Sequence, residues 1–264
     1  MFIAINSNGQ NIYTALHLNE QREYKATKPK KIIETNTFYN TSGKQVDKNI
    51  KTFDAAGMLQ TEERFEEDGN LTARLTYIAD TLHKIFLSRT MERWGRGGYT
   101  KETAVYSYDS NYFLIRTADK DANGNITMNS YHVNDAQGHP VELTVFDGNG
   151  HPYGKETATY FYERNMAIVS VFSNAGNKLS TDSGEISFLN AALFPGGGSM
   201  YNTHADATNW VSKNLRGEET FFESEYVYDK FGNCTKNKIY KVIVKPNGKR
   251  KKDIDRIFEK EYFY

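Results

Sequence analysis

A short turn motif recurs along this chain and restricts it to a fold built from β-hairpins. Its clearest copy is Tyr228-Asp229-Lys-Phe-Gly232. Asp at the first position of a type I turn accepts a hydrogen bond from a backbone N–H two residues on, and Gly at the fourth tolerates positive φ. The motif therefore predicts a short hairpin loop, often with a one-residue bulge. Its copies, some with the aromatic and some with only the Asp, are Tyr39/Gly43, Phe53/Gly57, Phe65/Gly69, Phe146/Gly150, Phe172/Gly176, Tyr228/Gly232, Asp121/Gly124 and Asp135/Gly138.

The spacing of these turns leaves room for one strand between each pair. Successive glycines lie 12 or 14 residues apart, or 26 apart for a double unit. A strand of about eight to ten residues plus a turn fills that length. A longer repeat lies over the short one, because the segment from Tyr99 to Asp109 matches the segment from Tyr153 to Glu163. We therefore predict an all-β fold, an extended twisted antiparallel meander of repeated hairpins that forms a β-spiral or a barrel, open or closed.

The pattern also divides the chain. We expect an N-terminal segment over residues 1–34 and a β-hairpin repeat domain over residues 35–264. Residues 187–222 interrupt the repeats with Pro195-Gly-Gly-Gly and longer irregular runs. We predict a short helical piece or a long loop there. It would serve either as a cap on apolar surface or as a binding loop, because sites often lie on long loops of rigid sheets.

Composition excludes several classes of protein. Lys and Arg number 33, as do Asp and Glu, and this balance argues against a nucleic-acid partner. Aromatic residues reach 14%, which favours strands. The single cysteine, Cys234, excludes an intrachain disulfide. No stretch is long and apolar enough to span a membrane. The residues that follow Met1 lack the features of a signal peptide, so we expect either a cytosolic protein or one whose leader has been removed.

The strongest candidate for chemistry is the segment Asp119-Lys-Asp121-Ala-Asn123-Gly-Asn125. It has the alternating oxygen ligands and the glycine of an EF-hand-like calcium loop. It departs from that pattern at the twelfth position, where Ser130 replaces the bidentate Glu. It also coincides with a predicted hairpin turn, where Asp and Asn are expected for the turn alone. Calcium is therefore one interpretation and a plain turn is the other; no other cofactor is expected.

Aromatic side chains supply a second set of candidates. Trp94 and Tyr99 flank Gly95-Arg-Gly-Gly98, which we expect to form a wide turn. Exposed aromatics beside such a turn can stack on sugar rings, and Trp210 in the irregular segment is a further candidate platform for a ligand. An enzyme that used residues 187–222 as its active-site loop would need a nearby His and acid, such as His204 and Asp206.

The turn motifs resemble those of a known family. Tyr228-Asp229-x-x-Gly232, Phe53-Asp54-x-x-Gly57 and Phe146-Asp147-x-x-Gly150 are similar to the repeats of YD-repeat (RHS-type) proteins. The run from Glu225 to Tyr264 resembles the ends of uncharacterised YD-repeat-like secreted proteins of Bacteroidetes. The resemblance covers residues 35–264 in patches. It implies long antiparallel sheets that coil or close around a space, in bacterial secreted or cell-surface proteins that bind, display or encapsulate other molecules.

These observations lead to a functional hypothesis. We expect a non-enzymatic binding or scaffold module that works outside the cytoplasm, in the periplasm or at the cell surface, with a protein or a glycan as its partner. The extracytoplasmic location is implied by the resemblance. The alternatives are a carbohydrate-binding surface protein that uses Trp94, Tyr99 or Trp210, and an enzyme with its site in residues 187–222.

Overall fold

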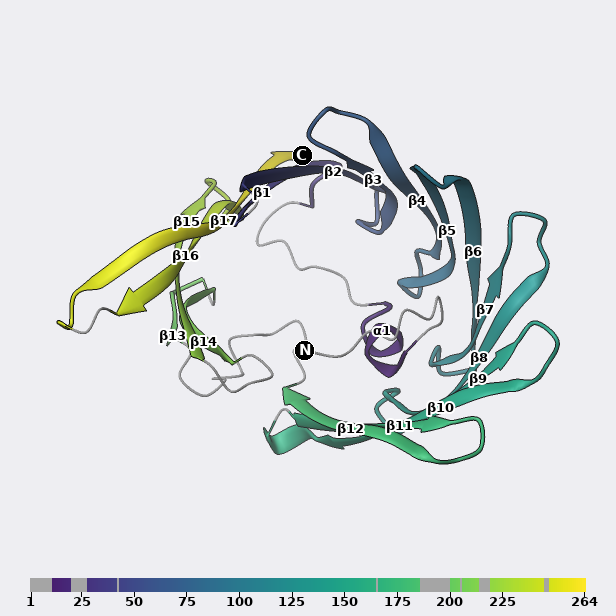
Figure 1. Ribbon diagram of the computed structural model, residues 1–264. Helices are drawn as coiled ribbons and strands as arrows, with labels where there is room; N and C mark the ends of the chain where they lie inside the picture. The colour runs from purple at the N-terminus through teal and green to yellow at the C-terminus, as the bar shows by residue number, and fades with distance from the viewer. Residues whose placement is uncertain are drawn as a thin grey trace. The chain divides into compact units, whose positions relative to one another are not determined.

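The computed structural model describes residues 11–19, 28–41, 43–164, 166–185, 200–204, 206–213, 219–244 and 247–264 (Figure 1). Within these residues the chain forms 17 strands, one short α-helix and one 3-10 turn. The prediction of an all-β antiparallel meander is confirmed. Contacts between Cα atoms divide the chain into two units, and each is described by itself.

Unit 1 contains residues 1–21 and 75–188. Each of its strands from β5 onward pairs antiparallel with the next. The strands curve around the helix α1, which contacts β9 and β10 (Figure 1). We call the face toward α1 the inner face of unit 1. The elements are α1 (Ile12–Leu16), β5 (Ile85–Gly95), β6 (Gly98–Tyr108), β7 (Leu114–Lys120), β8 (Ile126–Asn134), β9 (Pro140–Asp147), β10 (Pro152–Phe161), the 3-10 turn η1 (Tyr162–Arg164), β11 (Met166–Ser173) and β12 (Lys178–Glu185).

Unit 2 contains residues 22–74 and 189–264. Its first strand pairs with both the second strand and the last strand of the chain, so that Lys31 lies opposite Thr52 on one side and Phe263 on the other. A simple meander does not predict this second pairing. The strands are β1 (Lys31–Asn40), β2 (Gly43–Phe53), β3 (Leu59–Phe65), β13 (Met200–Tyr201), β14 (Ala207–Lys213), β15 (Glu219–Tyr228), β16 (Cys234–Val244) and β17 (Arg250–Phe263), and β4 (Leu71–Asp80) crosses the boundary between the units.

The predicted turns form as the motif requires. In the copy at Asp229, the N–H of Gly232 donates to the Asp229 carbonyl at 3.0 Å, and the Asp229 N–H donates to the Asn233 carbonyl at 2.9 Å. Asp229 Oδ1 accepts the N–H groups of Phe231 and Asn233. Gly232 has φ 81°, which a residue with a Cβ adopts only with strain. Every glycine of the predicted turns has positive φ: Gly43, Gly57, Gly69, Gly124, Gly138, Gly150, Gly176 and Gly232.

A tyrosine pins several of these turns. The Tyr264 hydroxyl donates to the free oxygen of Asp229, Oδ2, and accepts from Asn233 Nδ2. At the turn of Asp135, the Tyr162 hydroxyl likewise donates to Asp135 and contacts His139. At a further turn the two roles are exchanged, because Asn202 Nδ2 donates to the Tyr228 hydroxyl and that hydroxyl donates to Asp206. We call this arrangement the tyrosine clasp.

A second tyrosine, two residues earlier in the chain, reinforces each clasp. Its hydroxyl donates to the carbonyl of the residue that opens the strand after the same turn. The pairs are Tyr160 with Pro140 at 2.8 Å, Tyr226 with Ala207 at 2.7 Å and Tyr262 with Cys234 at 3.0 Å. The two rings of each Tyr-x-Tyr sequence are stacked. In each clasp, the tyrosine at the end of one strand therefore bonds to the turn that leads into the strand before it.

Three details differ from the sequence predictions. Residues 95–98 form a tight two-residue turn, with Gly95 paired to Gly98, rather than a wide one. In the segment 187–222, the described residues include the strands β13, β14 and the start of β15, so the prediction of a helical piece or long loop is wrong for these parts. Its Pro195 region lies outside the described residues. A further turn has Tyr112 in place of glycine, at φ 62°, which the glycine pattern could not reveal.

We predict that the clasp contributes measurably to stability. Tyr228→Phe removes the hydroxyl that joins Asn202 and Asp206 and leaves both side chains without that partner. We expect the free energy of unfolding to fall by about 1–3 kcal/mol. Urea denaturation followed by circular dichroism measures the change. The control is Tyr153→Phe, an exposed tyrosine of β10, which should change little; equal effects of the two substitutions would contradict a specific role for the clasp.

Candidate functional site

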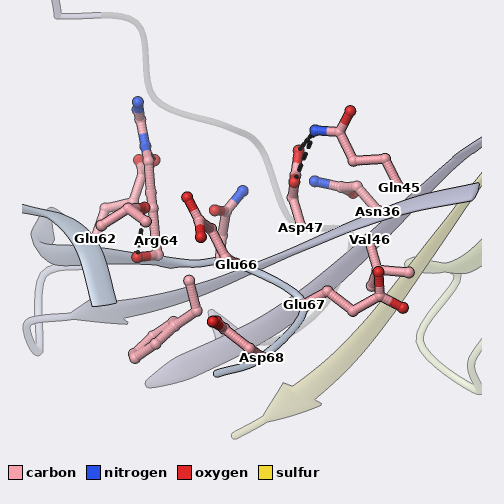
Figure 2. A pocket seen from close by; sticks show the side chains of 12 residues that line it. Asn36, Gln45, Val46, Asp47, Glu62, Arg64, Glu66, Glu67 and Asp68 are labelled. Carbon is pink, nitrogen blue, oxygen red and sulfur yellow. Dashed lines mark hydrogen bonds and ion pairs between the residues drawn. The ribbon is translucent and has the colours of Figure 1, made fainter. Parts of the chain in front are cut away.

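An acidic pocket of about 730 Å³ lies over the first three strands of unit 2 (Figure 2). This volume is in the usual range for ligand sites. Most of its walls are polar side chains, with Val46 and Phe65 as the apolar exceptions. The polar lining residues are Asn36, Gln45, Asp47, Asn49, Glu62, Arg64, Glu66, Glu67, Asp68 and Thr72.

The strand registers explain why these side chains meet. Asn36 of β1 lies opposite Asp47 of β2, and Asn49 of β2 lies opposite Arg64 of β3. Paired residues of an antiparallel sheet share a face, and so do residues two apart on one strand, which adds Glu62 to the same face. The turn after β3 supplies the remaining acids. Figure 2 shows Asp47, Glu62 and Glu66 projecting to the same side of the strands.

The charges in this pocket are unbalanced. The lining includes five carboxylates and a single guanidinium, that of Arg64, which is already paired with Glu62 at 2.7 Å. Within the described part of the chain, the other four acids have no ion pair with Lys or Arg. Asp47 accepts only an amide N–H from Gln45, at 3.1 Å. A group of close carboxylates without cations produces a negative potential that attracts cationic ligands.

A second pocket, of about 430 Å³, shares Asn36 with the first and extends over β15, β16 and β17. Glu34, which lines this pocket and is only 7% exposed, forms ion pairs with Lys51 at 2.8 Å and with Lys260 at 3.2 Å. Burial alone would raise the pKa of Glu34, but the two ammonium groups outweigh it and lower that pKa. Glu34 is therefore ionised at neutral pH. The segment 187–222 contributes Asp206 to this pocket.

The candidate calcium ligands are divided between a strand and a turn. Asp121 Oδ1 accepts the N–H groups of Asn123 and Asn125, and its Oδ2 accepts from Asn125 Nδ2 at 3.0 Å. Both carboxylate oxygens of Asp121 thus serve the turn, as the plain-turn interpretation expects. Asp119 is on β7 and faces Met128, which packs on the inner-face core. Among the described residues, no three His, Cys, Asp or Glu side chains form a group suited to a metal.

Two of the three candidate aromatics come together. Trp94 and Tyr99 pair across the β5–β6 hairpin with ring centroids 5.7 Å apart, and Tyr99 is 52% exposed. The Tyr99 hydroxyl donates to Glu92 at 2.6 Å. Trp210 belongs to unit 2, where its ring stacks on Phe222 at 5.3 Å. The first pair forms an aromatic surface at a hairpin tip, as the carbohydrate alternative requires.

The residues suggested for an enzyme site have structural partners. The ring of His204 stacks on Tyr228 with centroids 3.9 Å apart. Asp206 accepts the Tyr228 hydroxyl at 2.6 Å within the clasp. The acid and the imidazole thus both contact one tyrosine of a turn.

Sequence reasoning missed the acidic pocket. The signal was present, because Glu62, Glu66, Glu67 and Asp68 form a local acidic run in a chain of zero net charge. The Phe65/Gly69 motif accounts for these residues as a strand and a turn, and the motif by itself does not point to a pocket. The contribution of Asp47 from the neighbouring strand depends on register and could not be read from the sequence.

Comparisons with known proteins identify no family. No protein-family model matches the chain, and no curated protein matches it. Solved structures with some likeness include a porin-like protein from Bacteroides uniformis, with 13% identity and a TM-score of 0.48 over 89% of this chain and 98% of that one. A porin-like protein from Bacteroides vulgatus has 10% identity and a TM-score of 0.22 over 86% of this chain and 97% of that one. The TcdB2-TccC3 structure has 11% identity and a TM-score of 0.36 over 86% of this chain, which spans 14% of that one. The YD-repeat resemblance therefore stays a prediction.

No described helix could cross a bilayer.

We predict that Asp119 makes stability depend on pH. Burial raises its pKa from the ordinary 3.8 to about 6, although Arg89 opposes the shift. The folded state therefore binds a proton more tightly than the unfolded state, and this group's contribution to stability falls as pH rises from about 4 to about 6. Asp119→Asn should raise the free energy of unfolding by about 1–2 kcal/mol at pH 8 and much less at pH 4. Denaturation at both pH values measures this; an equal effect at both would refute it.

Proposed function

We propose that this chain is a non-enzymatic binding or scaffold module that holds a basic segment of a partner polypeptide in the acidic pocket of unit 2. The observation that carries the proposal is the set of carboxylates around Asp47, Glu66, Glu67 and Asp68, which no cation of the described chain neutralises. A Lys or Arg side chain of a partner would supply the missing charge. The amides of the lining could bond the partner's backbone.

The surrounding framework suits a scaffold. Asp47 and Glu62 lie on paired strands whose register is fixed, and the other three acids lie on a hairpin turn closed by the Gly69 N–H to the Glu66 carbonyl at 3.0 Å, so the backbone that carries them is ordered before any ligand arrives. Such preorganisation reduces the cost of ordering side chains on binding. The turn acids elsewhere in the chain are occupied by backbone N–H groups and tyrosine clasps, which supports a structural role for them.

We further propose that the module works outside the cytoplasm. This rests on the resemblance of its turn motifs to those of YD-repeat proteins. Cell fractionation with an antibody to the native chain tests it, and recovery in the cytoplasmic fraction alone would refute it.

The binding proposal is tested with a fluorescent tetralysine peptide. Asp47→Asn combined with Glu67→Gln removes two pocket charges without touching an ion pair. We expect the Kd for the peptide to rise about tenfold, which corresponds to about 1.4 kcal/mol. Binding to the native protein should also weaken as salt is raised, because exposed charges are screened over about 8 Å at physiological ionic strength. Fluorescence anisotropy measures both effects.

The matched control removes two exposed acids elsewhere, with Asp182→Asn on β12 and Glu261→Gln on β17. It changes the net charge by the same amount but leaves the pocket intact, so the Kd should stay near the native value. Equal losses in the pocket variant and the control would show that only net charge matters. Absence of binding to the native protein would reject the proposal.

One observation favours a carbohydrate ligand as a second candidate. The Trp94–Tyr99 pair is exposed at its tip, and aromatic faces at such positions stack on sugar rings. A glycan array probed with the native protein and with Tyr99→Ala tests this. A glycan signal that Tyr99→Ala abolishes supports it, and an array without signal rejects it.

A further inference from the structure

A short segment crosses the inner face of unit 1. This segment, which we call the strap, consists of residues 11–19 and includes α1. At one end Ile12, 2% exposed, packs among Leu143, Val145 and Ala158 of β9 and β10. At the other end Asn19 bridges β5 and β6, accepting from the Phe86 N–H at 3.0 Å and contacting the Tyr108 hydroxyl at 3.2 Å. In the order of paired strands, β7 and β8 lie between the two anchors, and α1 lies on the inner side of the curved strands (Figure 1).

The inner face between these two anchors carries buried polar side chains. Leu143, Val145 and Ala158, which pack around Ile12, form what we call the Ile12 socket. Thr117 of β7 lies opposite Ser130 of β8, and Ser130 lies opposite Val145 of this socket. All three residues therefore share the inner face. Thr117 and Ser130 are fully buried and His132 is 6% exposed. Within the described residues, Ser130 Oγ, His132 Nδ1 and Asp119 Oδ2 are buried without a hydrogen-bond partner. Buried polar atoms without partners are costly, so this part of the inner face is left with unmet hydrogen-bonding capacity.

The same face holds a carboxylate that meets only a neutral donor from the strap. Glu156 Oε2 accepts the backbone N–H of Ile12 at 2.9 Å. Burial raises the pKa of Glu156 despite this hydrogen bond, which shows that one N–H does not compensate for the lost hydration. A cation at the position of the Ile12 nitrogen would pair with the charge directly. Glu156 lies opposite Leu143, one of the residues that pack around Ile12, so the carboxylate and this apolar cluster are adjacent on the inner face.

We propose that the inner face of unit 1 is a binding groove for a cationic segment of polypeptide that carries an apolar side chain next to its positive charge, and that the strap is its intramolecular occupant. The apolar side chain fills the socket of Ile12, and the cation pairs with Glu156. The incoming segment displaces the strap. This groove lies in unit 1 and the acidic pocket in unit 2, so either can fail without the other.

The test uses two synthetic peptides of the strap sequence from Ile12 to Asn19, one with a free N-terminal ammonium and one N-acetylated. The free amine places a positive charge where the Ile12 N–H now meets Glu156. The strap is loosened in the full-length chain by Ile12→Ala with Asn19→Ala. We expect this variant to bind the free-amine peptide at least tenfold more tightly than the acetylated one, and more tightly than the native chain does. Fluorescence anisotropy gives the Kd values.

Two further substitutions in the loosened variant locate the interaction. Glu156→Gln should remove the preference for the free amine. Glu142→Gln, on the opposite face of β9, should preserve it. Equal binding of the two peptides, or a preference that survives Glu156→Gln, would overturn the proposal.

A measurement on the native chain covers the case in which the loosened variant does not fold. The Ala15 and His17 amides are hydrogen-bonded within the strap. Excess free-amine peptide should accelerate their hydrogen exchange by displacing the strap, and the acetylated peptide should do so much less. Unchanged exchange at saturating peptide would overturn the proposal.

Discussion

The hydrogen bonds between a tyrosine hydroxyl and a turn hold this meander in register. A hairpin turn alone fixes two strands, but a clasp such as that of Tyr264 on Asp229 reaches from the end of a third strand. The carboxylate of Asp229 then serves two purposes, because one oxygen closes the turn and the other accepts the hydroxyl. Burial raises the pKa of Tyr264 and the carboxylate adds to that shift, so the phenol stays protonated and can donate. The recurrence of Tyr-x-Tyr in the sequence follows from this geometry.

The sequence predicted the repeated part of the fold because each turn is a local event. Asp and Gly at fixed spacing specify a type I turn with a bulge wherever they occur, and alternating side chains specify the strands between. The pairing of β1 with β17 joins residues more than 200 positions apart and has no local signal. The strand at Ala207–Lys213 was missed for a related reason, since the turn that precedes it uses Asn202 and Asp206 rather than Asp and Gly.

The candidate sites depend on which side chains share a face, and this explains why the sequence did not show them. The acidic pocket combines Asp47 from one strand with Glu66 from the turn after the next, and a chain of zero net charge hides the local excess. The groove under the strap combines Ile12 with Glu156, which are 144 residues apart. The aromatic pair Trp94 and Tyr99 was found because a short hairpin brings its two sides together. Sites within one hairpin are thus predictable, and sites across strands are not.

Amide hydrogen exchange in a Tyr264→Phe variant tests whether the clasps hold the turns. The amides of Phe231 and Asn233 donate to the carboxylate that Tyr264 clasps. If the clasp holds this turn, exchange becomes faster at these two amides and in the neighbouring ends of β15 and β16, while exchange in β6–β8 stays unchanged. Unchanged exchange at Phe231 and Asn233, or a uniform increase along the whole chain, would contradict it.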